Sequence, residues 1–336
     1  MDMSHDREPA PDVEHVPVLA DELLELVDVR PGDVVVDGTF GAGGHARLLT
    51  ARMEGRGSYI GIDRDPAAEA RFQRFADEQS GVATRFVAGT FPDAFSALAA
   101  DSVSADVVIL DIGVSSMQID EPQRGFSYMN DGPLDMRMDP TTGTGADVLV
   151  NEGSPDDIAR VLREYGEEPS AWRIAQAIVT ARDLSPLTTT RQLANVVYEA
   201  SPAAARTGRG HPAKRTFQAL RIAVNDELGM IDRGLDAALS LLKPGGRLAV
   251  IAFHSLEDRI VKRRFAAWRG QCTCPPGLPV CACGAHAKVV PLTRRAVKAG
   301  RAELERNPRA ASSRLRAVSA VQVDPKTDAE PDGDAA

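Results

Sequence analysis

The sequence predicts an α/β fold in which a mostly parallel sheet is covered by helices on both faces. Among its 336 residues, five apolar segments have the length and composition of buried strands: 34–37, 58–63, 84–88, 106–111 and 248–253. Helical patterns lie between them, and this alternation is typical of parallel sheets. A further segment, 315–323, alternates apolar and polar residues, which predicts an antiparallel strand at the sheet edge.

A glycine-rich turn follows the first strand. It has the sequence Asp37-Gly38-Thr39-Phe40-Gly41-Ala42-Gly43-Gly44-His45, and a helix is expected over 46–53. Because glycine has no Cβ, backbone N–H groups at such a turn can approach a ligand closely. The second strand ends in Asp63, where a carboxylate is suited to a ribose diol. The turn and the carboxylate together predict a pocket for a nucleoside cofactor.

Two classes of cofactor fit this pocket. The spacing Gly41-x-Gly43-x-x-Ala46 also suits a nicotinamide dinucleotide. Asp37, however, precedes the glycines and is placed to hold a cationic methionine end, and the turn over 242–248 resembles one common in methyltransferases. Neither feature suits a pyrophosphate especially well. S-adenosylmethionine is therefore favoured, with an NAD(P)-linked oxidoreductase as the alternative enzyme class.

The composition indicates a protein without membrane contact. Hydrophobic residues make up 43% of the chain, yet no apolar run approaches the ~20 residues of a membrane span. Residues 1–13 are polar and lack the apolar core of a signal peptide, so a cytoplasmic location is expected. The net charge of −9 argues against binding of nucleic acid. Residues 288–316, however, contain nine Lys or Arg and only two acidic residues. This asymmetry predicts a basic face, with a merely solvated surface as the alternative.

The long gap between the fourth and fifth strands predicts an insertion. Roughly a hundred residues separate Asp111 from a helix expected near Thr216, far more than a crossover needs. Helical patterns fill the gap at 158–165, 171–181 and 189–199. Residues 116–215 are therefore expected to form an inserted, all-helical substrate-recognition subdomain. The other predicted units are a discontinuous cofactor-binding domain, formed by residues 14–115 and 216–324, and two disordered tails. The tails are residues 1–13 and the acidic residues 325–336.

Every strand candidate of the parallel sheet ends in chemically distinctive residues. In open parallel sheets, ligands bind outside the carboxyl ends of the strands. The candidate site residues at this edge are the glycine loop with His45, then Asp63, Phe91, Asp111 with Gln118 beyond it, and His254. A residue of this kind, taken alone, is more commonly a core residue or a helix cap. Ser255 and Asp258, for example, form a capping-box pattern for the helix expected after the fifth strand. Five such strand ends at one edge predict a functional site.

Two further stretches are suited to a substrate. Residues 124–139 mix Arg, aromatic and acidic residues with little apolar periodicity, which is typical of a pocket lining. Residues 210–221 place basic side chains at the start of a helix, where charge and unpaired N–H groups both suit phosphate. The alternative for the second stretch is a solvated helix end.

These segments together closely resemble one family, the bacterial S-adenosylmethionine-dependent methyltransferases that modify cytosine N4 in small-subunit ribosomal RNA. The matching motifs cover nearly the whole chain except the tails: 15–19 (His-Val-Pro-Val-Leu), the glycine loop, 61–65, 111–116, 124–140, 211–221, 251–259, and 307–310 with 312–314. The resemblance implies a Rossmann-like class I methyltransferase fold. It also implies a cytoplasmic enzyme, a monomer or homodimer, that acts on a cytosine in the decoding region of 16S ribosomal RNA within the small ribosomal subunit. An RNA-binding assembly factor with a vestigial pocket is the non-enzymatic alternative.

The resemblance implies cofactor contacts from seven residues in the matching motifs: Gly43, Gly44, His45, Asp63, Phe91, Asp111 and Gln118. A sulfonium already carries an activated methyl group, so catalysis is expected to consist of positioning and exclusion of water, without a metal. Asp111 is the first candidate to accept a hydrogen of the target amine, and His254 is the second. An Asn/Asp-Pro-Pro-aromatic motif, common in amino-methyltransferases, is replaced here by Asp-Ile-Gly, so chemistry at N4 follows from the resemblance alone. The target base is expected to flip into the pocket.

All four cysteines lie in one short segment, as Cys272, Cys274, Cys281 and Cys283. A cytosolic location makes structural disulfides improbable, and four thiolates this close suit a tetrahedral zinc site, with His286 as another possible ligand. The Cys-x-Cys spacing is tighter than that of most zinc sites, so a metal-free loop near the RNA face is the other interpretation. The prediction carried forward is that no metal is bound.

Overall fold

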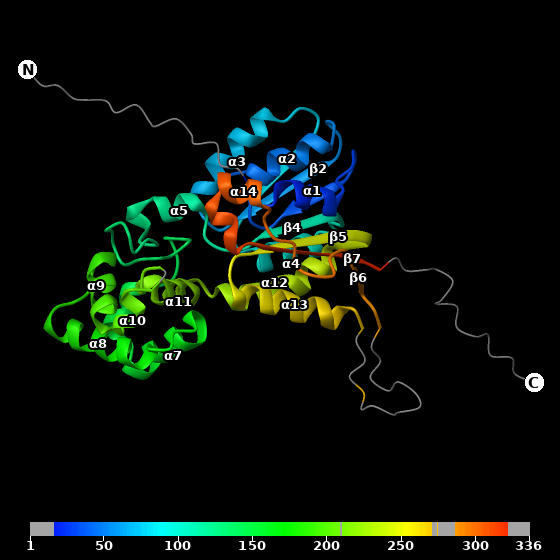
Figure 1. Ribbon diagram of the computed structural model, residues 1–336. Helices are drawn as coiled ribbons and strands as arrows, with labels where there is room; N and C mark the ends of the chain where they lie inside the picture. Colours follow the sequence, from blue (N-terminus) through cyan, green and yellow to red (C-terminus); the bar gives the residue numbers. More distant parts are fainter. Residues whose placement is uncertain (1–16, 209, 271–273, 275–285, 322–336) are drawn as a thin grey trace, which may run out of the picture.

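A seven-stranded sheet lies beside a separate group of helices in the computed structural model (Figure 1), which describes residues 17–208, 210–270, 274 and 286–321. The two predicted disordered tails, 1–13 and 325–336, fall outside the described residues. Cys272, Cys281 and Cys283 also fall outside the described residues. Both interpretations of the cysteine segment, a zinc site and a metal-free loop, therefore lie outside them as well. Within the described ranges, no helix combines the length and the apolar character that a membrane crossing requires.

The sheet has the strand order β3-β2-β1-β4-β5-β7-β6. The strands are β1 (Val34–Asp37), β2 (Ser58–Asp63), β3 (Ala83–Ala88), β4 (Ala105–Asp111), β5 (Leu242–Ala252), β6 (Val289–Pro291) and β7 (Arg314–Ala320). The first five are mutually parallel, whereas β7 runs antiparallel to both β5 and β6. The predicted α/β class with a mostly parallel sheet is thus confirmed.

Two predicted strands differ in detail. The antiparallel strand near the C-terminus was expected at the edge, but β7 lies one position inside it because β6 pairs with it, Val289 opposite Ala320. A strand as short as β6 carries too little alternation to be recognised in a sequence. Strand β5 begins at Leu242 rather than at 248, and its pairing with β4 shifts register between Ala105 and Val107. The expected turn over 242–248 is therefore an irregular first part of the strand.

Helices cover both faces of the sheet. They are α1 (Ala20–Val27), α2 (Gly44–Arg52), α3 (Ala67–Glu78), α4 (Phe91–Ala100), α12 (Glu227–Leu241), α13 (Ser255–Trp268), α14 (Arg301–Arg306) and the 3-10 turn η2 (Pro308–Ser312). Successive strand residues point to opposite faces. Val35 accordingly belongs to the core that includes α1, α2 and α3, and Val36 to the core that includes α4, α12 and α13.

The remaining helices form the helical part of the molecule, and most of them pack around a third core. They are α5 (Ser116–Asp120), η1 (Pro122–Arg124), α6 (Ala146–Glu152), α7 (Pro155–Gly166), α8 (Ala171–Leu184), α9 (Thr190–Ala200), α10 (Ala203–Arg206) and α11 (Ala213–Asn225). Ser154 and Thr189 cap two of them with their side-chain oxygens. Phe217 and Leu220 of α11 are buried in this core, so the predicted boundary at 215/216 falls inside a helix of the helical part. The division into domains remains a prediction.

Asp37 is turned into the core at the end of β1. The carboxylate is 1% exposed, accepts the Tyr59 hydroxyl at 2.6 Å and accepts the Thr39 backbone N–H at 2.9 Å. Burial raises the pKa of Asp37 to about 6. Asp37 therefore supports the turn after β1 and is not among the residues that line the cavity described below, and its contact with the methionine end of a cofactor stays a prediction.

The buried pair yields a stability prediction. Tyr59→Phe is expected to lower the free energy of unfolding by about 1–3 kcal/mol, because Asp37 loses a buried donor. The loss is expected to be larger at pH 8 than at pH 5, since Asp37 ionises near pH 6 and the carboxylate needs the donor more. Denaturant unfolding at the two pH values measures both effects. Tyr198→Phe, at a side chain that is 42% exposed, is the control and should change neither. Equal losses for Tyr59→Phe at both pH values contradict this account.

Candidate active site

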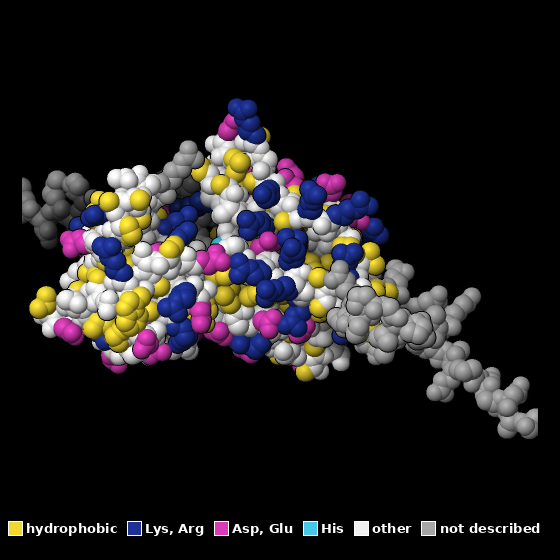
Figure 2. Space-filling view, turned by 60° about the horizontal axis from the view of Figure 1, so that its bottom comes forward, with side chains coloured by type: hydrophobic (Ala, Val, Ile, Leu, Met, Phe, Trp, Pro, Cys, Tyr) yellow, Lys and Arg dark blue, Asp and Glu magenta, His cyan; other side chains and the backbone are white. Residues whose placement is uncertain are grey.

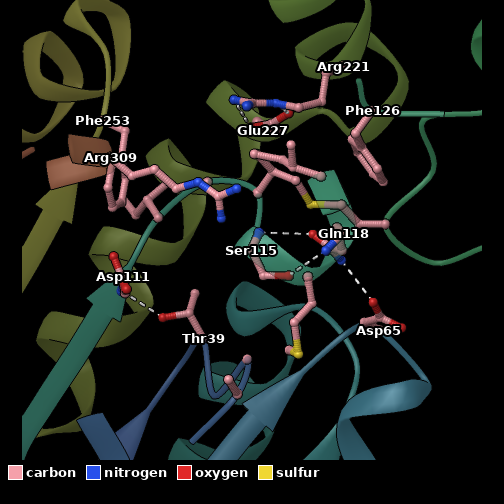
Figure 3. A pocket seen from close by; sticks show the side chains of 18 of the residues that line it. Thr39, Asp65, Asp111, Ser115, Gln118, Phe126, Arg221, Glu227, Phe253 and Arg309 are labelled. Carbon is pink, nitrogen blue, oxygen red and sulfur yellow. Dashed lines mark hydrogen bonds and ion pairs between the residues drawn. The ribbon is translucent and has the colours of Figure 1, made fainter. Parts of the chain in front are cut away.

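A cavity of about 840 Å³ opens at the carboxyl ends of the parallel strands (Figure 3). Its wall includes the glycine loop, the ends of β2 and β4, and helix α5. The far wall comes from the helical part and from α12, and residues 307–312 reach it from the C-terminal segment. The position agrees with the edge at which the sequence predicts a site.

The glycine loop has the backbone conformation that glycine permits. Gly41 and Gly43 adopt φ values of 56° and 78°, in the left-handed region. A Cβ on Gly43 would lie 2.8 Å from Phe40 Cζ, so no larger residue fits. Gly44 and His45 line the cavity, whereas Gly43 precedes α2 as its N-cap and does not line it. A cofactor contact from Gly43 stays a prediction.

Asp63 lies at the end of β2 and faces the glycine loop. One carboxylate oxygen accepts the Gly41 N–H at 2.8 Å, and the other accepts the Asp65 N–H at 2.9 Å. Burial raises the pKa of Asp63 in spite of these bonds. Each oxygen keeps a further lone pair, so the carboxylate can also accept hydroxyl hydrogens from the cavity side. This is the arrangement that a ribose diol needs.

Phe91 begins α4 and lines the cavity near the end of β3. Its ring packs against Gly234 in α12, where an added Cβ would lie only 2.0 Å from Phe91 Cε2. The orientation of Phe91 therefore depends on a glycine that the sequence analysis did not single out. The available signal was a glycine inside a helix, where that residue is otherwise unfavourable.

Gln118 lines the cavity, and its amide group also holds α5 in place. Its Oε1 accepts the Ser115 N–H at 3.1 Å, and its Nε2 donates to Asp65 at 2.8 Å. Figure 3 shows both Gln118 contacts, and Arg124 donates to the same Asp65 oxygen at 2.9 Å. Burial alone would raise the pKa of Asp65, but these hydrogen bonds hold it below its usual range. The predicted contact of Gln118 with a cofactor is untested, and its observed partners are structural.

His45 and Asp111 meet beside the cavity. His45 Nε2 donates to the Val18 carbonyl at 3.0 Å, which leaves Nδ1 at 3.6 Å from Asp111 Oδ2. Burial lowers the pKa of His45, so this ring is neutral at pH 7. Burial, together with the nearby charge of Glu257, raises the pKa of Asp111 to about 7. Asp111 Oδ1 is buried without a hydrogen-bond partner among the described residues, and it therefore offers a free acceptor.

His254 lines the cavity but directs both ring nitrogens toward Glu257. Nδ1 accepts the Glu257 N–H at 3.5 Å, and Nε2 lies 3.0 Å from Glu257 Oε1. His254 and Glu257 thus form the capping box of α13, one residue before the predicted pair Ser255 and Asp258. The position of His254 is compatible with contact to a base. Its role in proton removal stays a prediction.

A buried charge cluster that the sequence analysis missed lies behind His254. Arg221 donates to both oxygens of Glu227, at 2.7 and 2.9 Å. Ligand atoms of Glu227, His254 and Glu257 lie within 4.8 Å of one another, a spacing that suits a metal ion. Because Arg221 already occupies both oxygens of Glu227, its guanidinium supplies the positive charge in this cluster. Three of these residues stand in segments flagged in the sequence, but their pairing depends on the tertiary fold.

The raised pKa of Asp111 predicts a pH-dependent effect on stability. In the folded protein the Asp111 carboxyl holds its proton up to about pH 7, so folding favours the protonated form. Its contribution to the free energy of unfolding is complete below the ordinary pKa of 3.8 and is lost as the pH rises through 7. Asp111→Asn removes this dependence. The melting temperature of the variant relative to the unsubstituted protein should therefore be higher at pH 8 than at pH 5. Asp77→Asn, on the exposed surface of α3, is the control and should show no such trend. A pH-independent difference for Asp111→Asn argues against a buried, unpaired carboxyl.

Comparison with known proteins identifies the family of the chain. Residues 12–321 match the MraW methylase family. The chain is 53% identical over 316 residues to a ribosomal RNA small subunit methyltransferase H from Symbiobacterium thermophilum, covering 92% of this chain and 97% of the relative. Proteins of the same name from Heliobacterium modesticaldum and Geobacter sulfurreducens are 50% and 51% identical, covering 92% and 90% of this chain and 99% and 98% of theirs. The chain therefore belongs to the MraW methylase family.

Proposed function

We propose that this protein transfers a methyl group from S-adenosylmethionine to the exocyclic N4 amine of a cytosine in the decoding region of 16S ribosomal RNA, in the cytoplasm. The observation that carries the proposal is one cavity lined by a ribose-type acceptor, Asp63, and by a carboxyl with a free oxygen, Asp111. Membership of a methylase family whose relatives are small-subunit ribosomal RNA methyltransferases supports the same assignment.

The residues around the glycine loop fit the parts of the cofactor. Asp63 would accept the ribose hydroxyls, and the neighbouring ring of Phe91 would form an apolar wall for the adenine. Gly44 and His45 border the cavity at the start of α2, where the unpaired N–H groups of a helix favour a carboxylate. The bound sulfonium supplies an activated methyl group, and the chain has to position the acceptor and exclude water.

Asp111 is the residue best placed to act on the acceptor amine. The N4 lone pair is delocalised into the pyrimidine ring, so the amine is a poor nucleophile until an acceptor draws on one of its hydrogens. Asp111 Oδ1 has no other partner among the residues described and can accept that hydrogen. Its pKa of about 7 allows the carboxyl to take up the proton released on transfer near neutral pH. His254 is the second candidate, as a contact to the base.

The face around the cavity suits RNA. Figure 2 shows Lys and Arg side chains gathered where the molecule is hollowed between its helical part and its sheet. Lys214 and Arg309 reach the cavity wall itself, from α11 and η2. We expect them to contact phosphates on both sides of the target nucleotide. The protein is proposed to act as a monomer or a homodimer.

Asp63→Ala separates cofactor binding from later steps. We expect the variant to bind S-adenosylhomocysteine roughly 10- to 100-fold more weakly by calorimetry, because a charged acceptor for the ribose is lost. Asp77→Ala on exposed α3 is the matched control and should bind as the unsubstituted protein does. If the unsubstituted protein binds NADH and gives no signal with S-adenosylhomocysteine, the cofactor assignment is wrong.

Asp111→Ala tests the role in transfer. With labelled S-adenosylmethionine and small ribosomal subunits as acceptor, we expect kcat to fall about 100-fold or more, as when a preorganised acceptor is removed from a transition state. A change confined to the KM for the cofactor would leave Asp111 as a binding residue and contradict its proposed part in transfer. Mass mapping of the ribosomal RNA then identifies the methylated position.

A further inference from the structure

Four side chains of the helical part form a continuous stack, which we call the aromatic ladder: Tyr128, His211, Tyr198 and Arg206. The rings of Tyr128 and His211 are parallel to within 18°, with centroids 5.0 Å apart. The Tyr198 ring follows at 6.1 Å from His211, tilted by 32°. The Arg206 guanidinium lies 5.7 Å from the centroid of Tyr198, as a cation–π contact.

The aromatic ladder leads from the cavity to the surface. Tyr128 lines the cavity, and its ring is held at the edge by Phe217 of α11, with centroids 5.7 Å apart. At the other end, Tyr198 on α9 is 42% exposed and Arg206 on α10 is exposed. A cluster that served only the core would bury its rings. This one presents its outer half to solvent instead, and the two ends are joined through His211.

The surroundings of the aromatic ladder are basic. The segment from Arg206 to Arg221 carries several Lys and Arg and no acidic residue. Lys214 and Arg215 are both exposed at the start of α11, and Lys214 also lines the cavity. Stacked aromatic faces beside a positive groove are the combination that holds unpaired nucleotides, since each base has a flat face and each phosphate a negative charge.

We infer that the aromatic ladder binds an unpaired nucleotide next to the target cytosine. This inference rests on the proposed function and adds to it a specific site for the flanking RNA. A base in RNA can enter the cavity only if it leaves its neighbours, which then lose a stacking partner. The exposed Arg206 guanidinium, backed by the Tyr198 ring, offers such a neighbour a replacement surface, while Lys214 takes its phosphate. Tyr128 keeps the cavity end of the same stack in place.

The test compares RNA binding by Tyr198→Ala, Arg206→Ala and Tyr198→Phe. The probe is a fluorescent RNA oligonucleotide with the sequence around the target cytosine, measured by anisotropy in the presence of S-adenosylhomocysteine. We expect Tyr198→Ala to weaken binding about tenfold, the usual effect of removing one stacking aromatic, and Arg206→Ala to weaken it several-fold. Tyr198→Phe keeps the ring and should bind as the unsubstituted protein does. Trp172→Ala is the matched control, because Trp172 is 46% exposed on α8 of the same helical part but does not belong to the aromatic ladder.

The outcomes separate this inference from the proposed function. Calorimetry should show unchanged affinity of all four variants for S-adenosylhomocysteine, and in the methyl-transfer assay Tyr198→Ala should raise the KM for RNA with little change in kcat. If Tyr198→Ala binds and methylates as well as the unsubstituted protein does, or if Trp172→Ala weakens binding equally, the aromatic ladder is not an RNA site. If the unsubstituted protein itself methylates no ribosomal RNA, the proposed function fails, and this inference fails with it.

Discussion

The buried ion pair between Asp65 and Arg124 joins the sheet to the helical part. Asp65 follows β2, and Arg124 ends the short η1 helix beyond α5, with 2.9 Å between the paired atoms. The same guanidinium donates to the backbone carbonyl of Met138 at 2.8 Å, so this side chain ties together the two ends of segment 124–138, which contributes to the cavity wall. Removing one partner of such a buried pair typically costs about 3–5 kcal/mol, because a charge is left alone. The shape of the cavity therefore depends on this pair.

Asn225 performs a related task on the same segment. Its side chain accepts the Met138 N–H at 2.8 Å and donates to the Met136 carbonyl at 2.7 Å. Arg64, next to Asp63 in the chain, donates to the Asn225 backbone carbonyl at 3.1 Å. Arg64 thus ties the end of β2 to the junction between α11 and α12. The end of β2, which lines the cavity, is thus connected to the helical part through polar side-chain contacts.

The parts of this architecture that the sequence predicts are those with local signals. The glycine loop and Asp63 are adjacent to strands whose apolar composition is plain, and the structure places both at the cavity. The inward orientation of Asp37 was not predictable, because it depends on Tyr59, which faces it from the neighbouring strand. Glu257 was missed for a similar reason. Three residues after His254, it has the spacing of a helix cap, and only the fold places its carboxylate near Asp111 and Glu227.

These distant contacts also give the site its charge. Asp111, Glu227 and Glu257 are grouped near the ends of β4 and β5, and the guanidinium of Arg221 is committed to Glu227 by two hydrogen bonds. His45 is neutral because burial lowers its pKa, so it does not balance Asp111. Above about pH 7, where Asp111 is ionised, the cavity wall near this carboxylate therefore favours positive charge. A cationic sulfonium bound there would satisfy that preference, whereas the neutral thioether left after methyl transfer would not.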